Sequence, residues 1–490
     1  MREIWLQLLL VFTAFTASAD TRPNILFCMA DDWGWPHASA YGDEAVQTPN
    51  FDRLAREGVL FHHAYTTSPS CTPSRNAVIT GKYHWQLGPG ANLWSTLPSE
   101  HESFIHLLAD AGYTIGQNPP KTWGPGKLES WRKHHGEAPA GPTFKTFAEF
   151  LSQHDPAERP FFFWLATGDP HRSYKKGSGK AAGIDLEKVH LFEHFPDHPV
   201  VRNDVADYYF EVQRWDQLVG KAIDELTKRG LLENTIIVMT GDHGMPFPRG
   251  KGNLYDSGVR VPFVVRWGKS IKPGRDLQDF VSFADVAPTL LEASGTEIPD
   301  DMSGRSFLPL LKSTKSGRIA AEERPHIVFG RERHTPAHPL PYTGGYPSRG
   351  IRTPDFLYIR NYRTELWPAG SASTGNPRYP NQWYSDCDGG PSKSFIIDHR
   401  ESNPDCARAY KLCFAPRPAE ELYDLSQDPD QVRNVAGDPD RTAVLENLRN
   451  QLQQELADKK DPRASNPDYT GFDRHPYFGS GGGARSKPRK

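Results

Sequence analysis

One cysteine in the sequence has the setting of a reactive group. Cys71 begins the run CTPSR, which ends at Arg75, and small and apolar residues continue to Gly81. Pro73 is suited to the first turn of a helix and Gly81 to its end. Free N–H groups at such a helix start, with the nearby guanidinium of Arg75, would favour an anionic sulfur. A cysteine alone before an ordinary helix would be structural, so the interpretation depends on its surroundings.

Two pairs of possible metal ligands indicate a metal site. Asp31 and Asp32 follow one apolar run, and Asp242 and His243 follow another. Adjacent carboxylates repel each other when they are buried, and a bound cation removes that cost. A solvated acidic loop is the ordinary alternative, but the second pair supplies matching ligands.

Three further side chains are candidates for catalysis. His171 lies in the run DPHR directly after an apolar segment, Lys121 lies in PKTWGP, and Lys251 lies in RGKGNLY. A histidine that stands alone is usually structural, and loop lysines are usually solvated. The position of His171 directly after an apolar run, like the positions of Asp31-Asp32 and Asp242-His243 after other runs, favours a functional role for it as a proton donor.

Short apolar runs predict the buried strands that must position these groups. They are bounded by Gly, Pro or Asp and cover residues 24–29, 161–166, 235–239 and 262–266. Apolar residues at spacings of three and four predict a long amphipathic helix over 205–226, with Asp204 as N-cap and Gly230 as its stop. Such alternation predicts an α/β fold with a large, mostly parallel sheet flanked by helices. Ligands of this architecture bind at the carboxyl ends of the strands.

The chain is long enough for more than one domain. We expect a signal peptide at 1–19, a catalytic domain at 20–345, a smaller C-terminal α+β domain at 346–465 and a flexible tail at 466–490. The C-terminal pattern tightens at 421–425 and in a helix-like stretch at 444–456. The export signal predicts a secreted or periplasmic protein with no membrane association after cleavage.

Export also bears on the five cysteines. One disulfide is expected among Cys387, Cys406 and Cys413, without a choice of pair, whereas Cys28 fits a buried strand. The formal net charge of −3 gives no broad basic surface and argues against nucleic acid as a partner.

The segment from Cys71 to Gly81 resembles the signature of the sulfatase family, with matches at Cys71, Pro73, Ser74, Arg75, Thr80 and Gly81. This resemblance, which covers roughly residues 22–310, implies an alkaline phosphatase-like fold. It further implies that a formylglycine-generating enzyme converts Cys71 to formylglycine, whose hydrate attacks sulfur and later expels sulfate. The substrate would be a sulfated saccharide.

The resemblance also implies roles for the other candidates. Asp31, Asp32, Cys71, Asp242 and His243 would hold one Ca²⁺, and catalysis would rest on Cys71, Arg75, Lys121, His171 and Lys251. His243 stands where the family often has Asn, so Mn²⁺ and Zn²⁺ remain alternatives, since imidazole is a softer donor. Trp123 stands where many sulfatases have His, which leaves the role of Lys121 less defined.

Within the family, the segments 159–172 and 246–255 look most similar to sulfamidases, the N-sulfoglucosamine sulfohydrolases. The sequence does not choose between cleavage of an S–N and an S–O bond. A phosphodiesterase or phosphonate hydrolase of the same superfamily is one alternative. A catalytically silent sulfoglycan-binding protein, in which Cys71 is never converted, is another.

Overall fold

A seven-stranded sheet forms the centre of the protein. The computed structural model describes residues 22–119, 123, 126–156, 158–339, 342–372 and 383–479. The strand order of the sheet is β4-β6-β1-β7-β8-β2-β9. These strands are β1 (Asn24–Ala30), β2 (Val59–Tyr65), β4 (Thr114–Gln117), β6 (Phe161–Ala166), β7 (Thr235–Gly241), β8 (Arg260–Arg266) and β9 (Arg275–Ser282). All four runs predicted from the sequence are strands of this sheet.

The sheet is mostly parallel, as the sequence predicted. β4, β6, β1 and β7 are parallel neighbours, and β2 and β9 are parallel to each other, whereas β8 pairs antiparallel with both β7 and β2. An extended connection of about twenty residues between β7 and β8 contains only the short helix α8 (Asp256–Val259). If β8 ran parallel to β7, the chain would have to cross over the sheet between them, usually as a helix on one face. The connection instead stays at the ends of the strands, so β8 runs antiparallel to β7.

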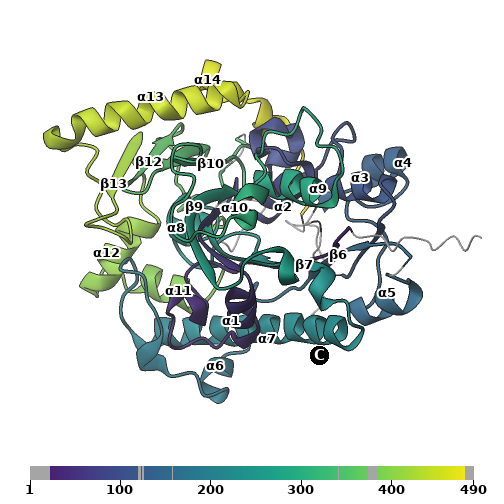
Figure 1. Ribbon diagram of the computed structural model, residues 1–490. Helices are drawn as coiled ribbons and strands as arrows, with labels where there is room; N and C mark the ends of the chain where they lie inside the picture. The colour runs from purple at the N-terminus through teal and green to yellow at the C-terminus, as the bar shows by residue number, and fades with distance from the viewer. Residues whose placement is uncertain are drawn as a thin grey trace, which may run out of the picture.

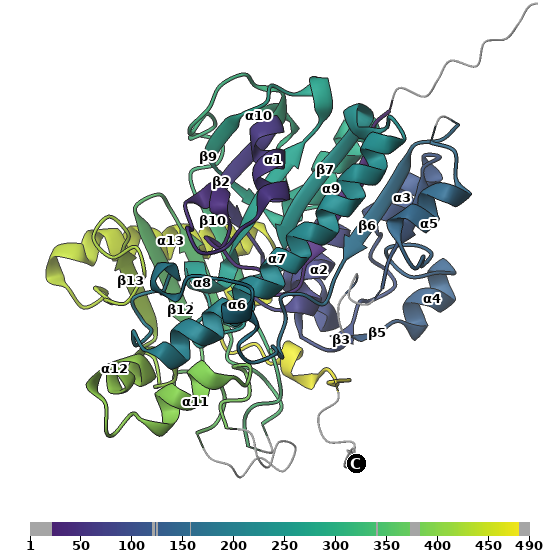
Figure 2. The same cartoon turned by 90° about the horizontal axis from the view of Figure 1, so that it is seen from below.

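Helices cover both faces of the sheet (Figures 1 and 2). Alternate residues of β1 face opposite sides, so Leu26 and Cys28 join one core while Ile25 and Phe27 join the other. The first face is covered by α1 (Pro49–Glu57), α5 (Phe147–Gln153) and α7 (Pro199–Lys228). The second is covered by α2 (Cys71–Thr80), α3 (Phe104–Asp110), α4 (Glu129–His135), α9 (Val286–Ser294) and α10 (Leu308–Lys312).

The long helix α7 begins earlier than the sequence predicted. Its N-cap is His198, whose side chain accepts a hydrogen bond from the Val200 amide, and Pro199 occupies the first turn. Asp204, which was expected to be the N-cap, lies inside the helix and binds Arg172 instead. That prediction was wrong because the charged side chain serves a tertiary contact. The helix ends just before Gly230, which has a φ of +69°.

A second, four-stranded antiparallel sheet packs beside the first. Its strands are β10 (Ile327–Arg331), β11 (Ser348–Arg352), β12 (Phe356–Asn361) and β13 (Glu420–Asp424), and α13 (Thr442–Asp458) covers one face. Figure 1 shows α13 lying along this sheet at the edge of the molecule. β10 precedes residue 346, so residues on both sides of the expected domain boundary build this sheet.

The insertion between β12 and β13 carries two helices, α11 (Pro391–Asp398) and α12 (Pro404–Cys413). Both pack into the core cluster that contains α7. Short elements complete the fold: the two-stranded pair β3 (Ser95–Thr96) and β5 (Gly126–Lys127), α6 (Ser178–Ala181) and α14 (Pro462–Ser465).

The segment 466–479 is not a flexible tail, so that prediction was wrong for these residues. Phe472 is buried, and its carbonyl accepts a 2.8 Å hydrogen bond from Asn92. Arg333 donates to the carbonyl of His475, and the Phe478 amide donates to that of Trp94. Residues 480–490 and the expected signal peptide at 1–19 lie outside the described residues.

All five cysteines are free thiols in the structure, so the expected disulfide among Cys387, Cys406 and Cys413 is not formed. Cys28 is fully buried in β1, as expected. None of the helices in the described part of the chain combines the length and the hydropathy that crossing a bilayer requires.

Candidate active site

The N-terminus of α2 positions Cys71. Ser70 is the N-cap in an extended conformation, Cys71 is the first helical residue, and Gly81 ends the helix with a φ of +66°. Every residue of α2 is buried, and Cys71 is only 4% exposed. The predicted helix and its stop are therefore confirmed.

The Cys71 thiol is not predisposed to ionise. Its burial raises the pKa well above the usual value, and the carboxylates of Asp31, Asp242 and Asp32 add to that shift, although Lys251 opposes it. Desolvation and the three nearby carboxylates therefore oppose the ionisation of Cys71 that the helix start and the cations favour.

The pairs Asp31-Asp32 and Asp242-His243 lie close together because the strands that precede them, β1 and β7, are neighbours. Ala30 of β1 is paired in register with Gly241 of β7, so Asp31 and Asp242 leave adjacent parallel strands at the same edge. The Asp32 amide donates a 2.8 Å hydrogen bond to Oδ1 of Asp242. Asp32 has a φ of +72°, which is uncommon for a residue other than glycine and recurs at functional sites.

Two buried cations lie against these carboxylates. Arg75 Nε is 3.0 Å from Asp242 Oδ2, and its Nη2 is 3.2 Å from Asp31 Oδ1. Lys251 Nζ is 2.9 Å from Asp32 Oδ1. Burial disfavours the charged form of Lys251, but the carboxylates of Asp32 and Asp388 outweigh this and raise its pKa well above normal.

The cluster fits a divalent cation. The possible ligand atoms form two sets that share Cys71: one with Asp32 and His243, the other with Asp31 and Asp242, each within 4.8 Å. The carboxylates of Asp31, Asp32 and Asp242 converge here, and a divalent cation would offset their mutual repulsion. Carboxylate oxygens with one imidazole suit Ca²⁺, Mn²⁺ or Zn²⁺.

His243 is oriented as a metal ligand would be. Its Nδ1 lies 3.1 Å from the carbonyl oxygen of Gly244, which only an N–H can satisfy. Nε2 is then free of a proton in the neutral ring, and it lies 3.3 Å from both Cys71 Sγ and Asp32 Oδ1. A second hydrogen bond that fixes the tautomer in this way is typical of metal-binding histidines.

His171 lies at the partly exposed side of the cluster. Its side chain is 27% exposed, Nε2 is 3.9 Å from Asp32 Oδ2, and Nδ1 is 2.5 Å from the carbonyl oxygen of Arg172. Arg172 in turn makes two 2.8 Å hydrogen bonds to Asp204 of α7. The loop after β6 is thereby tied to α7, which fixes the direction of the imidazole.

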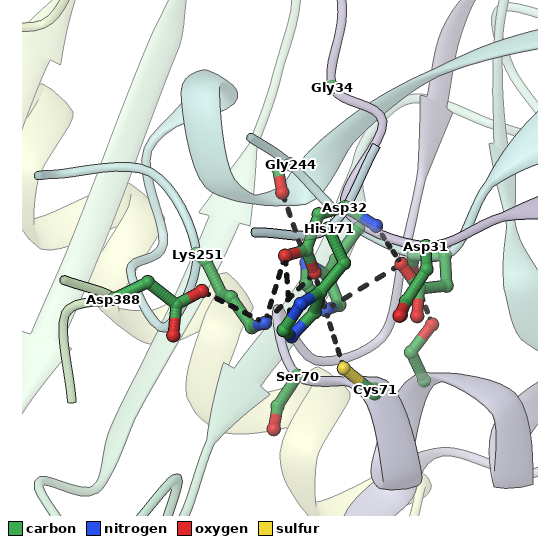
Figure 3. Close-up of polar contacts among 12 residues, drawn as sticks. Asp31, Asp32, Gly34, Ser70, Cys71, His171, Gly244, Lys251 and Asp388 are labelled. Carbon is green, nitrogen blue, oxygen red and sulfur yellow. Dashed lines mark hydrogen bonds and ion pairs between the residues drawn. The ribbon is translucent and has the colours of Figure 1, made fainter. Parts of the chain in front are cut away.

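The structure brings together eight of the nine residues proposed from the sequence: Asp31, Asp32, Cys71, Arg75, His171, Asp242, His243 and Lys251. Asp31, Asp32, Cys71, His171 and Lys251 are labelled in Figure 3. The remaining residue, Lys121, lies outside the described residues, so its role stays a prediction.

Sequence reasoning missed two neighbours of this cluster. Asp388 Oδ2 is 3.2 Å from Lys251 Nζ, and His334 Nδ1 is 2.8 Å from Ser70 Oγ. Both come from loops of the C-terminal half, where neither periodicity nor a local motif marks them. The clustering of acidic residues in the run SDCDGG was the only available signal for Asp388.

Comparison with known proteins identifies the class and then the family. A solved complex of a protein with its substrate D-glucosamine-2-N,6-O-disulfate superposes with a TM-score of 0.65 at 20% identity, covering 91% of this chain and 99% of that one. The fold is thus alkaline phosphatase-like. The profile of the sulfatase family matches residues 23–296, more than half of the chain. The protein belongs to the sulfatase family and is a hydrolase of sulfuric esters.

Two relatives extend the similarity beyond the catalytic core. An ulvan-active sulfatase of Formosa agariphila is 29% identical over 445 residues, which cover 88% of this chain and 80% of the relative. The N-sulphoglucosamine sulphohydrolase of Homo sapiens is 29% identical over 511 residues, covering 91% and 92% of the two chains. Matches this long include the second sheet.

Proposed function

We propose that the protein removes sulfate from a sulfated saccharide by means of a formylglycine at position 71 and one bound Ca²⁺. The observation that carries this proposal is the position of Cys71, at the start of α2 and 3.3 Å from His243 Nε2. Burial and the neighbouring carboxylates raise the pKa of the Cys71 thiol. The hydrate of an aldehyde at the same position would supply an oxygen nucleophile.

We assign separate roles to the residues of the site. Asp31, Asp32, Asp242 and His243, with residue 71, would hold the cation, which when bound withdraws electron density from the oxygens around sulfur. Arg75 and Lys251 supply fixed positive charge to the sulfate, where charge redistributes as its bond breaks. His171 would give a proton to the departing sugar atom. Lys121 is proposed as a further sulfate-binding cation on the family resemblance alone.

The names of the relatives support a saccharide as substrate. One is described as active on ulvan and the other as acting on N-sulphoglucosamine. The apolar stretch and small-residue cleavage pattern in residues 1–19 support export, so we propose a secreted or periplasmic enzyme. A formylglycine-generating enzyme would be its partner in maturation, and no lasting membrane contact is proposed after signal cleavage.

Two measurements on protein produced together with a formylglycine-generating enzyme test the proposal. Peptide mass spectrometry should find the mass of formylglycine at position 71. The matured protein should release sulfate from a panel of N- and O-sulfated saccharides, and a Cys71→Ala variant of equal thermal stability should not. Conversion without sulfate release from any substrate would contradict the proposal, as would turnover by the Cys71→Ala variant.

The panel also addresses the alternatives. Faster turnover of phosphate or phosphonate esters than of sulfate esters would assign the protein to another hydrolase class. Saturable binding of sulfated saccharides by a protein whose Cys71 remains unmodified under these conditions would favour a binding protein.

A further inference from the structure

Asp388 is a carboxylate beside a site that binds an anion. Its side chain is 26% exposed, and Oδ2 lies 3.2 Å from Lys251 Nζ. One carboxylate oxygen of Asp388, one ring nitrogen of His171 and one carboxylate oxygen of Asp32 all lie within 4.8 Å of one another. In Figure 3, Asp388 and Asp32 lie on opposite sides of the Lys251 ammonium. Asp388 therefore borders the space beside the expected proton donor.

The loop that carries Asp388 is held on both sides. Before it, Lys393 Nζ donates hydrogen bonds to the carbonyls of Cys387 (2.7 Å) and Tyr384 (3.0 Å). After it, the amide and hydroxyl of Ser392 donate to Oδ2 of Asp204, at 3.0 and 2.7 Å.

The same Asp204 binds Arg172, which follows His171 in the chain. One buried carboxylate therefore anchors the segments of both His171 and Asp388. If His171 and Asp388 both act on the same atom of the substrate, their positions relative to each other must be fixed, and this anchoring fixes them.

A second metal ion does not account for Asp388. The Lys251 ammonium occupies the space between Asp388 and Asp32, with Nζ 3.2 Å from one and 2.9 Å from the other. A negative group at this place also repels the sulfate of the substrate, so it favours a reaction in which the leaving atom gains positive charge.

We propose that Asp388 recognises the nitrogen of an aminosugar leaving group, which makes the protein selective for N-sulfated over O-sulfated saccharides. This inference rests on the proposed function and specifies that the S–N bond is cleaved in preference to an S–O bond. The S–N bond breaks with both electrons going to nitrogen, while the SO₃ unit passes to the oxygen nucleophile at position 71. Nitrogen takes one proton from His171.

The overall reaction is R–NH–SO₃⁻ + H₂O → R–NH₃⁺ + SO₄²⁻, in which the amine takes its final proton from water. Alkylamines are cationic near neutral pH, so the product carries positive charge on the atom beside Asp388. Hydrolysis of a sulfate ester, R–O–SO₃⁻ + H₂O → R–OH + SO₄²⁻ + H⁺, leaves a neutral hydroxyl. A carboxylate beside the leaving atom thus favours the first reaction more than the second.

Asp388→Asn, which keeps the shape and removes the charge, tests the inference in the matured, calcium-loaded enzyme. The ratio of kcat/KM for glucosamine N-sulfate to kcat/KM for 4-nitrophenyl sulfate should fall about tenfold, or ~1.4 kcal/mol. Inhibition of 4-nitrophenyl sulfate hydrolysis by the product gives a second readout. Glucosamine should inhibit the parent enzyme more strongly than glucose, and the variant should lose this preference.

Asp398→Asn, at the exposed end of α11, is the matched control for the loss of one negative charge, and both readouts should stay as in the parent. Equal losses on both substrates would show that Asp388 only orients Lys251, and unchanged ratios would show that it does not meet the leaving group. Equal inhibition of the parent enzyme by glucosamine and glucose would also overturn the inference. A parent enzyme inactive on every sulfate would instead refute the proposed function.

Discussion

Replacement of Lys251 by methionine should slow turnover far more than it unfolds the protein. Methionine keeps an unbranched apolar stem and removes the ammonium, which lies 2.9 Å from Asp32 and 3.2 Å from Asp388. The side chain is 4% exposed, so solvent cannot replace the lost charge. The substitution therefore separates the electrostatic role of the residue from its volume.

The two effects can be estimated from the geometry. Removal of one partner of a buried ion pair typically costs about 3–5 kcal/mol of folding free energy. Asp388 is 26% exposed and can be hydrated, and a bound cation would compensate Asp32. We therefore expect a loss near the lower limit, about 3 kcal/mol, in metal-free protein and a smaller loss with Ca²⁺. Loss of a fixed charge at the sulfate should lower kcat/KM by about 10²–10³.

The assay pairs 4-nitrophenyl sulfate kinetics with urea unfolding, each in calcium and in chelator. Lys269→Met, an exposed lysine in the loop after β8, serves as the control and should behave as the parent protein. Near-normal kinetics of Lys251→Met in a stably folded state would remove Lys251 from the site and refute this reasoning.

Three further predictions concern stability. Arg75→Ala leaves the buried carboxylates of Asp31 and Asp242 without their cation, so the free energy of unfolding of metal-free protein should fall by about 3–5 kcal/mol; an unchanged urea midpoint would contradict this. Calcium should raise the thermal midpoint of chelator-treated protein in proportion to the logarithm of its concentration, and no shift with Ca²⁺, Mn²⁺ or Zn²⁺ would argue against the metal site. Burial, with the charges of Arg260 and Arg352, lowers the pKa of His63 to about 2. The unfolded chain then binds a proton below about pH 6.5 that the folded protein does not, so stability falls as the pH drops through this range. His63→Phe should remove about 2 kcal/mol of the stability lost between pH 7 and pH 5, as measured by urea midpoints, and equal pH dependence in both proteins would contradict the assignment.

The parts of the fold that the sequence predicted are those with strong local signals. Apolar runs bounded by turn residues gave the central strands, and Pro73 with Gly81 gave the limits of α2. The meeting of Asp31 with Asp242 also followed from the sequence, because the polar ends of neighbouring parallel strands share one edge of the sheet.

The features that could not be predicted from the sequence depend on tertiary contacts. Asp204 has the residue type of an N-cap, but the guanidinium of Arg172 binds it inside α7. The ionisation of Cys71 depends on the distances of carboxylates that lie 40 and 171 residues away along the chain. Asp388 reaches the site through a loop anchored by buried hydrogen bonds, and no local pattern records such an anchor.

Burial of the Cys71 side chain determines when its proposed conversion to formylglycine can occur relative to folding. With 4% of its surface accessible, this side chain cannot enter the active centre of another enzyme once the chain has folded. The proposed oxidation of Cys71 would therefore precede closure of the sheet around α2, while this segment is still unfolded. Protein that folds before this step would keep an unmodified Cys71 and would lack the proposed nucleophile.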